Sequence, residues 1–260
     1  MRSRRGPDTG GNRHPTRVAL VTGASSGIGF ATACVLANDV AVVVVHYHRN
    51  AAGAEKAADA VASAGAKPVL HQADLTRPAE VQGMAEAVLR QHGRVDILVN
   101  NAGGVERVPI LQCTPAQWHS AFVQNLHPAF ECSRILLPGM IERGWGRVVN
   151  ISSMAALRGG DPQETVHYAA AKAALNTYAQ GLARAMARTG VTVNVVAPGF
   201  VDTPLQDQPP GRRATFEKRV AGTPAGRAAT PGEVAAVVRF VASEAASYML
   251  GEVVTVSGGL

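Results

Sequence analysis

Cysteine is scarce in this sequence, with three in 260 residues. Cys34, Cys113 and Cys132 stand in apolar helical patterns, without the paired or metal-like spacings that disulfide scaffolds and zinc sites require. Long hydrophobic runs are also absent, because the longest aliphatic stretch, residues 40–45, is far too short to cross a bilayer. These absences argue against a disulfide-rich secreted scaffold and a membrane protein. They favour a cytoplasmic protein with core thiols and no metal.

Positive charge is concentrated at one end of the chain. Residues 1–17 carry five arginines and one aspartate, so they supply +4 of the formal net charge of +6. This segment is rich in Gly, Pro and Arg and has no apolar stretch behind it that could serve as a signal sequence, so we expect residues 1–16 to form a disordered extension. An arm that binds nucleic acid is the alternative, which we rank below a solvated tail. We expect neither nucleic acid nor membrane as a partner.

The remainder, residues 17–260, alternates aliphatic and amphipathic segments in the manner of one large α/β domain. Because a parallel strand must return by a crossover, this order predicts a Rossmann-type, doubly wound, mostly parallel seven-stranded sheet with helices on both faces. The expected strands are 17–23, 40–45, 67–74, 95–100, 146–152, 191–199 and 252–256.

Several helix boundaries are marked by capping residues. "TPAQ" at 114–117 and "TPGE" at 230–233 each place Thr at the N-cap, Pro next and Gln or Glu at the third position. Thr76 is expected to cap a helix that Gly93 ends. One helix is expected through "WHSAFVQNLHPAF" (118–130) and another from about 165 to 188.

A glycine-rich turn follows the first strand. "TGASSGIG" spaces Gly23, Gly27 and Gly29 so that a backbone could approach a pyrophosphate at a helix N-terminus. Taken alone, a purely structural turn explains the spacing equally well. Asp74 and the run Asn100–Gly103 also stand at the ends of strands, where ligands bind in open α/β sheets. Together these features favour a dinucleotide site.

The segment "YAAAK" places Tyr168 and Lys172 on one face of a helix. A nearby ammonium should lower the pKa of the phenol toward neutrality, so that the tyrosine could exchange a proton with a carbonyl oxygen. By itself this spacing is more often an ordinary helix face. Ser152 and Ser153 at the end of the preceding strand, and Asn125, shift the balance toward a catalytic group.

From residue 17 to 260 the chain resembles the short-chain dehydrogenase/reductase family, through TGASSGIG, Asp74, NNAG, Asn125, ISS, YAAAK, "APGFVDTP" and "VSGGL" in order. The resemblance implies Tyr168 as general acid/base, Lys172 as its cationic partner and a ligand of the nicotinamide ribose, Ser153 as donor to the substrate oxygen, and Asn125 as holder of a relay water. Ser153 is preferred to Ser152 because it matches the family position. The resemblance also implies a set of cofactor-binding residues: Gly23, Ser25, Ser26, Gly27, Ile28, Gly29, Asp74, Leu75, Asn101, Ala102, Gly103, Tyr168, Lys172, Pro198, Gly199, Val201 and Thr203.

The end of the second strand, "HYHRN", concerns the choice of cofactor. Family members that use NAD carry an acidic residue there, and Tyr47 occupies that position in this chain. His48 and Arg49 beside it, with Ser25 and Ser26, would meet a 2′-phosphate with donors and positive charge. We therefore expect NADPH, with NADH as the alternative.

The closest resemblance within the family is to 3-oxoacyl-acyl-carrier-protein reductases and related ketoreductases, which implies reduction of a 3-oxoacyl thioester or a related ketone. The segment 204–224 lies where relatives have a lid, and it carries Arg212, Arg213, Lys218 and Arg219. This basic charge could receive an acyl-carrier protein or coenzyme A, although a solvated helix face is the simpler interpretation. The alternatives are an oxidative alcohol or sugar dehydrogenase and a non-catalytic dinucleotide-binding regulator. The resemblance also implies a homotetramer.

Departures from the family pattern are few. The loop 154–167 is slightly longer than usual, which could alter the spacing from serine to tyrosine. Val40 replaces a common glycine and Ser257 a frequent aspartate.

Overall fold

A computed structural model describes residues 14–207 and 211–260. Within this part the strands form one seven-stranded sheet, and every pairing in it is parallel. Its order is β3-β2-β1-β4-β5-β6-β7. The strands are β1 (His14–Val21), β2 (Val40–Tyr47), β3 (Lys67–Gln72), β4 (Ile97–Asn100), β5 (Gly146–Ile151), β6 (Val191–Pro198) and β7 (Val253–Val256). The predicted doubly wound fold is confirmed.

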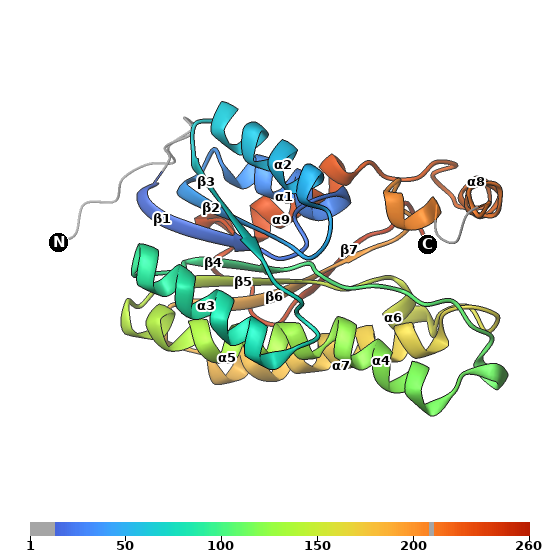
Figure 1. Ribbon diagram of the computed structural model, residues 1–260. Helices are drawn as coiled ribbons and strands as arrows, with labels where there is room; N and C mark the ends of the chain where they lie inside the picture. Colours follow the sequence, from blue (N-terminus) through green and yellow to red (C-terminus); the bar gives the residue numbers. More distant parts are fainter. Residues whose placement is uncertain (1–13, 208–210) are drawn as a thin grey trace.

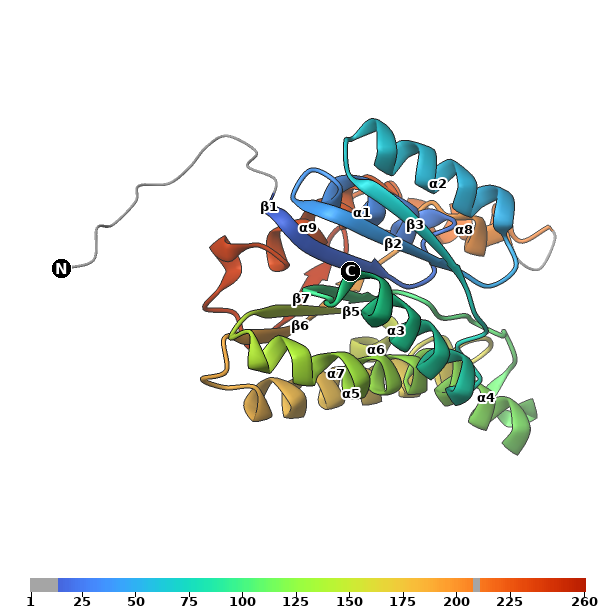
Figure 2. The same ribbon diagram turned by 60° about the vertical axis from the view of Figure 1, so that its left-hand side comes forward.

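Helices cover both faces of the sheet (Figures 1 and 2). One face packs against α1 (Gly27–Leu36), α2 (Ala51–Ser63) and α9 (Pro231–Val241). The other packs against α3 (Pro78–His92), α5 (His127–Glu142) and α7 (Val166–Ala185), and α4 (Pro115–Asn125) leads into α5. Buried aliphatic side chains fill both layers, so the central strands are apolar on both faces. No helix in the described part of the chain is long and apolar enough to span a membrane.

The order of the strands determines where a ligand can bind. From β1 the chain builds β2 and β3 on one side, and it then returns to build β4 to β7 on the other. The crossovers therefore leave in opposite directions beside β1 and β4, which opens a crevice at their carboxyl ends. Shorter elements stand at this end of the sheet: η1 (Ile110–Gln112), α6 (Ala155–Arg158), η2 (Pro204–Asp207) and α8 (Arg213–Ala221). A further short helix, η3 (Glu244–Ala246), precedes β7.

Both predicted capping boxes are present. Thr114 accepts from Gln117 N and Thr230 from Glu233 N, and in each case the Gln or Glu side chain accepts from the N-cap backbone. Gly93 ends α3 in the left-handed conformation at φ 70°.

Three expectations about boundaries were wrong. Strand β1 begins at His14, so residues 14–16 belong to the sheet rather than to an extension; residues 1–13 lie outside the described part of the chain. Thr76 does not cap α3, because its backbone and hydroxyl bind Asp74 and the helix begins at Pro78. The helix expected over 118–130 is broken between Asn125 and His127, because Pro128 has no N–H to continue it.

Candidate active site

A cleft of about 1030 Å³ opens at the carboxyl ends of the strands. It is lined by every residue predicted for catalysis or cofactor binding except Gly29 and Tyr47. The elements that supply them are the β1–α1 turn, the segments after β2, β3 and β4, the end of α4, α7, and the segments after β5 and β6. The topology thus brings together residues that are far apart in the sequence.

Tyr168 and Lys172 lie on the face of α7 that points into this cleft. The Lys172 ammonium is 5.9 Å from the centre of the Tyr168 ring, and it donates to the carbonyl of Ile151 at 2.8 Å. That carbonyl is at the end of β5, so the sheet fixes the position of the ammonium. Lys172 is buried, and this burial lowers its pKa from 10.5 to about 8.

The two serines after β5 have different roles in the structure. Ser152 is buried and its hydroxyl donates to the Lys172 carbonyl at 3.3 Å, which ties the strand to α7. Ser153 lines the cleft, where its hydroxyl accepts from Ala155 N at 3.1 Å and acts on the Tyr168 phenol so as to lower its pKa. Of the two serines, Ser153 is therefore the one that lines the cleft with a side chain acting on the phenol, and its role toward a substrate stays a prediction.

The expected shift of the phenol is wrong in direction. Burial raises the pKa of Tyr168, and the hydrogen bond from Ser153 and the positive charge of Arg107 only partly oppose it. The ammonium of Lys172 was expected to dominate, but it lies 5.9 Å from the centre of the ring, donates to the Ile151 carbonyl and is not among the groups that shift the phenol.

Asn125 is the last residue of α4 and is buried. Its amide nitrogen donates to the carbonyls of Gly104 and Ala121, both at 2.9 Å, and its amide oxygen faces Gly103. A Cβ on Gly103 would lie 2.5 Å from this oxygen and 3.5 Å from Lys172 Nζ. Glycine at this position therefore allows Asn125 and Lys172 to approach the same point.

The β1–α1 turn has the geometry of a phosphate-binding loop. Gly23 and Gly27 have φ of 64° and 55°, a conformation that favours glycine. Gly29 does not line the cleft, because it packs beneath the turn, where a Cβ would be 2.2 Å from the Gly23 carbonyl. Asn101 holds the turn from below by donating to the carbonyls of Thr22 and Gly23.

His46 completes the support of this turn and was missed by the sequence analysis. Its ring is buried, and Nδ1 accepts from Gly23 N at 2.9 Å while Nε2 donates to the Ala73 carbonyl at 3.1 Å. Burial lowers the pKa of His46 from 6.5 to about 4, so the neutral ring acts as a fixed acceptor. A polar residue within the aliphatic strand was the available signal.

The end of β2 differs from the prediction in one respect. Tyr47 packs against the hydrophobic core and does not line the cleft, because successive strand residues point to opposite faces. His48, Arg49 and Asn50 do line it. Asp74 lies beside them, 3.8 Å from the His48 ring, and a hydrogen bond from the Thr76 hydroxyl lowers the pKa of its carboxyl group.

The predicted nicotinamide end follows β6. Pro198, Gly199, Val201 and Thr203 line the cleft together with Leu260, which was not predicted. A Cβ on Gly199 would approach Leu260 and Ser257 to 3.0 Å, so the C-terminal segment closes this side.

The loop 154–167 forms α6 and a turn through Gly159 and Gly160, with φ of 82° and 76°. Tyr168 follows this loop and lines the cleft together with Ser153.

Two lid arginines turn inward rather than out to solvent. Arg212 donates to both oxygens of Glu164 at 2.6 and 2.5 Å, and Arg219 donates to Asp161 at 2.7 Å. Arg213 is bound on the outside to Asp202. The basic charge noted in the lid is therefore largely engaged within the molecule. Glu164, Asp161 and Arg107 at this end of the cleft were not predicted.

The sequence is similar to known proteins along most of its length. The family model described as Enoyl-(Acyl carrier protein) reductase matches residues 23–260. The 3-oxoacyl-[acyl-carrier-protein] reductase FabG of Vibrio cholerae is 36% identical over 244 residues, which cover 94% of this chain and 97% of that protein. The 3-oxoacyl-[acyl-carrier-protein] reductase of a Synechocystis species is 35% identical over 245 residues, covering 94% and 96%.

Solved structures of other proteins have the same fold as this chain. The acetoin dehydrogenase YohF from Salmonella typhimurium superposes with a TM-score of 0.83 at 34% identity, covering 94% of this chain and 96% of that one. The acetoin dehydrogenase from Enterobacter cloacae gives 0.82 at 33% identity, covering 94% and 95%. From the cleft, its residues and these similarities together, we conclude that the chain belongs to the short-chain dehydrogenase/reductase family and is an NAD(P)-dependent oxidoreductase.

Proposed function

We propose that this enzyme uses NADPH to reduce a ketone to a secondary alcohol, with Tyr168 as the proton donor. The observation that carries the proposal is the cleft that brings Ser153 and Tyr168 together with Lys172 and Asn125. Two donors directed at one point can bind a ketone oxygen, and the phenol can then give up its proton as negative charge develops there.

The residues around the cleft fit a dinucleotide. The glycines of the β1–α1 turn leave space where a Cβ would collide, and the free N–H groups of α1 suit a pyrophosphate. His48, Arg49, Ser25 and Ser26 would hold a 2′-phosphate, and Val201 and Thr203 the carboxamide. When bound, the nicotinamide supplies the hydride.

The protein's own groups would then move the proton. Tyr168 gives its proton to the substrate oxygen while Ser153 holds that oxygen in place. Lys172, charged below a pKa of about 8, stabilises the phenolate that remains. Asn125 would hold a water beside Gly103, through which Lys172 exchanges protons with solvent.

The substrate class follows from the relatives. The acyl-carrier-protein reductases among them favour a 3-oxoacyl thioester or a similar ketone. The acetoin dehydrogenases favour a second candidate, oxidation of a hydroxyketone. Arg212, Arg213 and Arg219 of the lid are bound to carboxylates of the chain itself, which weakens the case for carrier docking.

The experiment is a panel of ketones with NADPH and with NADH, followed by loss of absorbance, and the matching alcohols with the oxidised cofactors. Faster turnover of ketones with NADPH supports the proposal. Turnover of alcohols alone would support the dehydrogenase, and binding of cofactor without turnover would support a regulator.

We also propose a cytoplasmic homotetramer. The three cysteines of the chain are free, as is usual in the reducing cytoplasm. For the tetramer, the supporting observation is that Phe240 of α9, and Tyr248 and Leu250 between α9 and the edge strand β7, are exposed. Two-fold pairing of these surfaces would cover them. Sedimentation that finds only a monomer at micromolar concentration would contradict this assembly.

A further inference from the structure

The outer end of the cleft contains a group of charges that the proposed reaction does not use. We call it the arginine cluster: Arg107, Arg212, Arg219, Asp161 and Glu164. Glu164 is shared by all three guanidinium groups, since it accepts from Arg212 at 2.5 Å and from Arg219 at 3.1 Å and lies 3.8 Å from Arg107 Nε. The cluster therefore has three cations for two carboxylates.

The excess of positive charge is larger when all the residues that line the cleft are considered. Arg158 of α6 also lines this end of the cleft. Among the described lining residues the one other side-chain carboxylate is that of Asp74, which is bound to Thr76 beside the end of β3. The substrate end of the cleft is therefore positive, and it would attract a ligand with negative charge.

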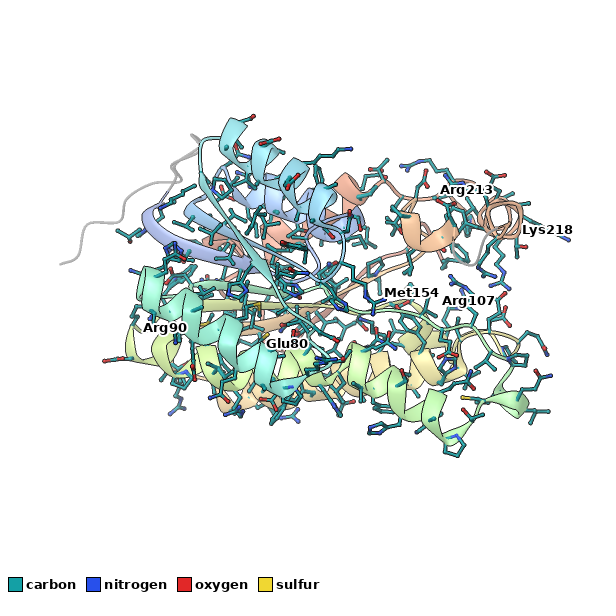
Figure 3. The ribbon with its side chains drawn as sticks, in the orientation of Figure 1. Glu80, Arg90, Arg107, Met154, Arg213 and Lys218 are labelled. Carbon is teal, nitrogen blue, oxygen red and sulfur yellow. The ribbon has the colours of Figure 1, made fainter. Side chains whose placement is uncertain are left out.

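Arg107 is held in a fixed position relative to Tyr168. The residue before it, Glu106, accepts through its carbonyl from His167 Nε2 at 2.8 Å, and the residue after it, Val108, donates to the Glu164 carbonyl at 3.0 Å. His167 is in the first turn of α7, next to Tyr168, and Glu164 lies just before this helix. In Figure 3 Arg107 lies beyond the carboxyl ends of the strands, and below α8 in this view.

Arg107 also lies close enough to influence the reacting group. Its side chain is 12% exposed, and its positive charge lowers the pKa of the Tyr168 phenol. A guanidinium buried to this degree is costly unless anions surround it, and it presents a planar fork that matches a carboxylate. An anion that arrived with the substrate would balance the excess charge of the cluster.

We propose that the substrate is a small oxoacid whose carboxylate pairs with Arg107 while its ketone lies against Tyr168 and Ser153; this inference rests on the function proposed above. The carboxylate belongs to the same compact molecule as the ketone, because Arg107 and Tyr168 line the same cleft and the charge of Arg107 acts on the phenol. The phosphates of a coenzyme A or carrier thioester are separated from the reacting carbonyl by the whole pantetheine arm, so they would lie outside this position.

The test compares matched pairs of ketones with NADPH: acetoacetate with methyl acetoacetate, and 4-oxopentanoate with its methyl ester. Each ester keeps the ketone and removes the charge. We expect the wild-type enzyme to prefer the acid in kcat/KM by about tenfold or more, as one charge-assisted pair allows. In Arg107→Gln this ratio should approach one, and Arg107→Lys should retain part of it.

Arg213→Gln is the matched control, because Arg213 lies on the outside of α8 and does not line the cleft. It should keep the wild-type ratio of acid to ester. Equal turnover of acid and ester by the wild-type enzyme would overturn the oxoacid proposal while supporting the reductase. Faster turnover of the N-acetylcysteamine thioester of acetoacetate than of the free acid would also overturn it.

A measurement without turnover separates the two proposals. If no ketone is reduced, the proposed function fails, and binding still tests the role of Arg107. The thermal midpoint of the NADPH-saturated protein should rise with 4-oxopentanoate more than with its ester, and Arg107→Gln should abolish the difference. Equal shifts by acid and ester would reject the anion site.

Discussion

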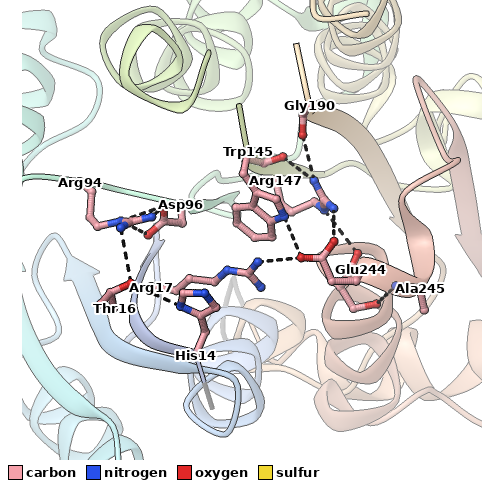
Figure 4. Close-up of polar contacts among 12 residues, drawn as sticks. His14, Thr16, Arg17, Arg94, Asp96, Trp145, Arg147, Gly190, Glu244 and Ala245 are labelled. Carbon is pink, nitrogen blue, oxygen red and sulfur yellow. Dashed lines mark hydrogen bonds and ion pairs between the residues drawn. The ribbon is translucent and has the colours of Figure 1, made fainter. Parts of the chain in front are cut away.

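Buried charge occurs at both ends of the sheet, but it is balanced differently. At the amino ends of the strands, Arg147 is bound to Glu244 and to the carbonyls of Gly146, Gly190 and Ser243, and it lies over Trp145 (Figure 4). Asp96 is fully buried there and accepts from Val18 N and from Arg94. The chain itself supplies the partners of these groups.

At the carboxyl ends, cations outnumber the carboxylates that line the cleft. Lys172 has its pKa lowered to about 8, and three guanidinium groups share Glu164. At the amino end, Arg17, Arg94, Arg143 and Arg147 also outnumber their two carboxylates, Asp96 and Glu244, but backbone carbonyls and the Trp145 ring complete their contacts. The cations at the carboxyl end instead line an open cleft that a ligand can enter. Substitutions at the two ends should separate activity from stability.

The largest effect is expected at the carboxyl end. Tyr168→Phe should reduce kcat by about a thousandfold, because the ring remains and the proton donor is lost. Cofactor binding, measured by NADPH fluorescence, and the free energy of unfolding should both stay close to the wild-type values. Residual activity above about a tenth of wild type would mean that another group donates the proton.

The next effect concerns stability at the amino end. Asp96→Ala should lower the free energy of unfolding by about 3 kcal/mol, since it leaves two half-buried arginines and the buried Val18 N without their acceptor. Urea unfolding measures this loss, and Glu55→Ala on the exposed face of α2 is the control, with an expected change under about 0.5 kcal/mol. A loss for Asp96→Ala no larger than that of the control would contradict the role assigned to the amino end.

A smaller effect tests His46, which joins the cofactor turn to the sheet. Its pKa is about 4 in the folded chain against 6.5 otherwise, so between these values the unfolded chain holds a proton that the folded chain does not. The stability given by the neutral ring is therefore lost as the pH falls, by about 2 kcal/mol between pH 7 and pH 5. His46→Asn should remove the part of the stability loss between pH 7 and pH 5 that comes from the imidazole. If the free energy of unfolding depends on pH identically in both proteins, His46 does not have this role.

The smallest effect is on cofactor choice. Arg49→Ala should lower kcat/KM for NADPH by about tenfold and leave NADH nearly unchanged, because the lost contact is with the 2′-phosphate. Steady-state kinetics with both cofactors measure the ratio. Arg77→Ala, an exposed change beside Asp74, is a control for a general loss of positive charge. If Arg49→Ala leaves the ratio of kcat/KM for NADPH to that for NADH unchanged, the 2′-phosphate binds elsewhere.

Local signals predicted a large part of the fold and site. The capping boxes at Thr114 and Thr230, the glycine turn and the pair Tyr168–Lys172 each depend on residues within one or two turns of each other. Such patterns are decided by backbone geometry alone. The end of α4 at Asn125 was missed because Pro128 was not treated as a break.

The sequence by itself determined the order of strands and helices, the doubly wound topology and the residues that meet at its crevice, because periodicity, caps and glycines act over short distances. The tertiary structure alone decided that Tyr47 turns to the core, that His46 holds the turn, and that burial raises the pKa of Tyr168. It also decided that Arg107, Arg212 and Arg219 meet at Glu164. The physical reason is that burial and charge pairing depend on which distant segments the crossovers bring together.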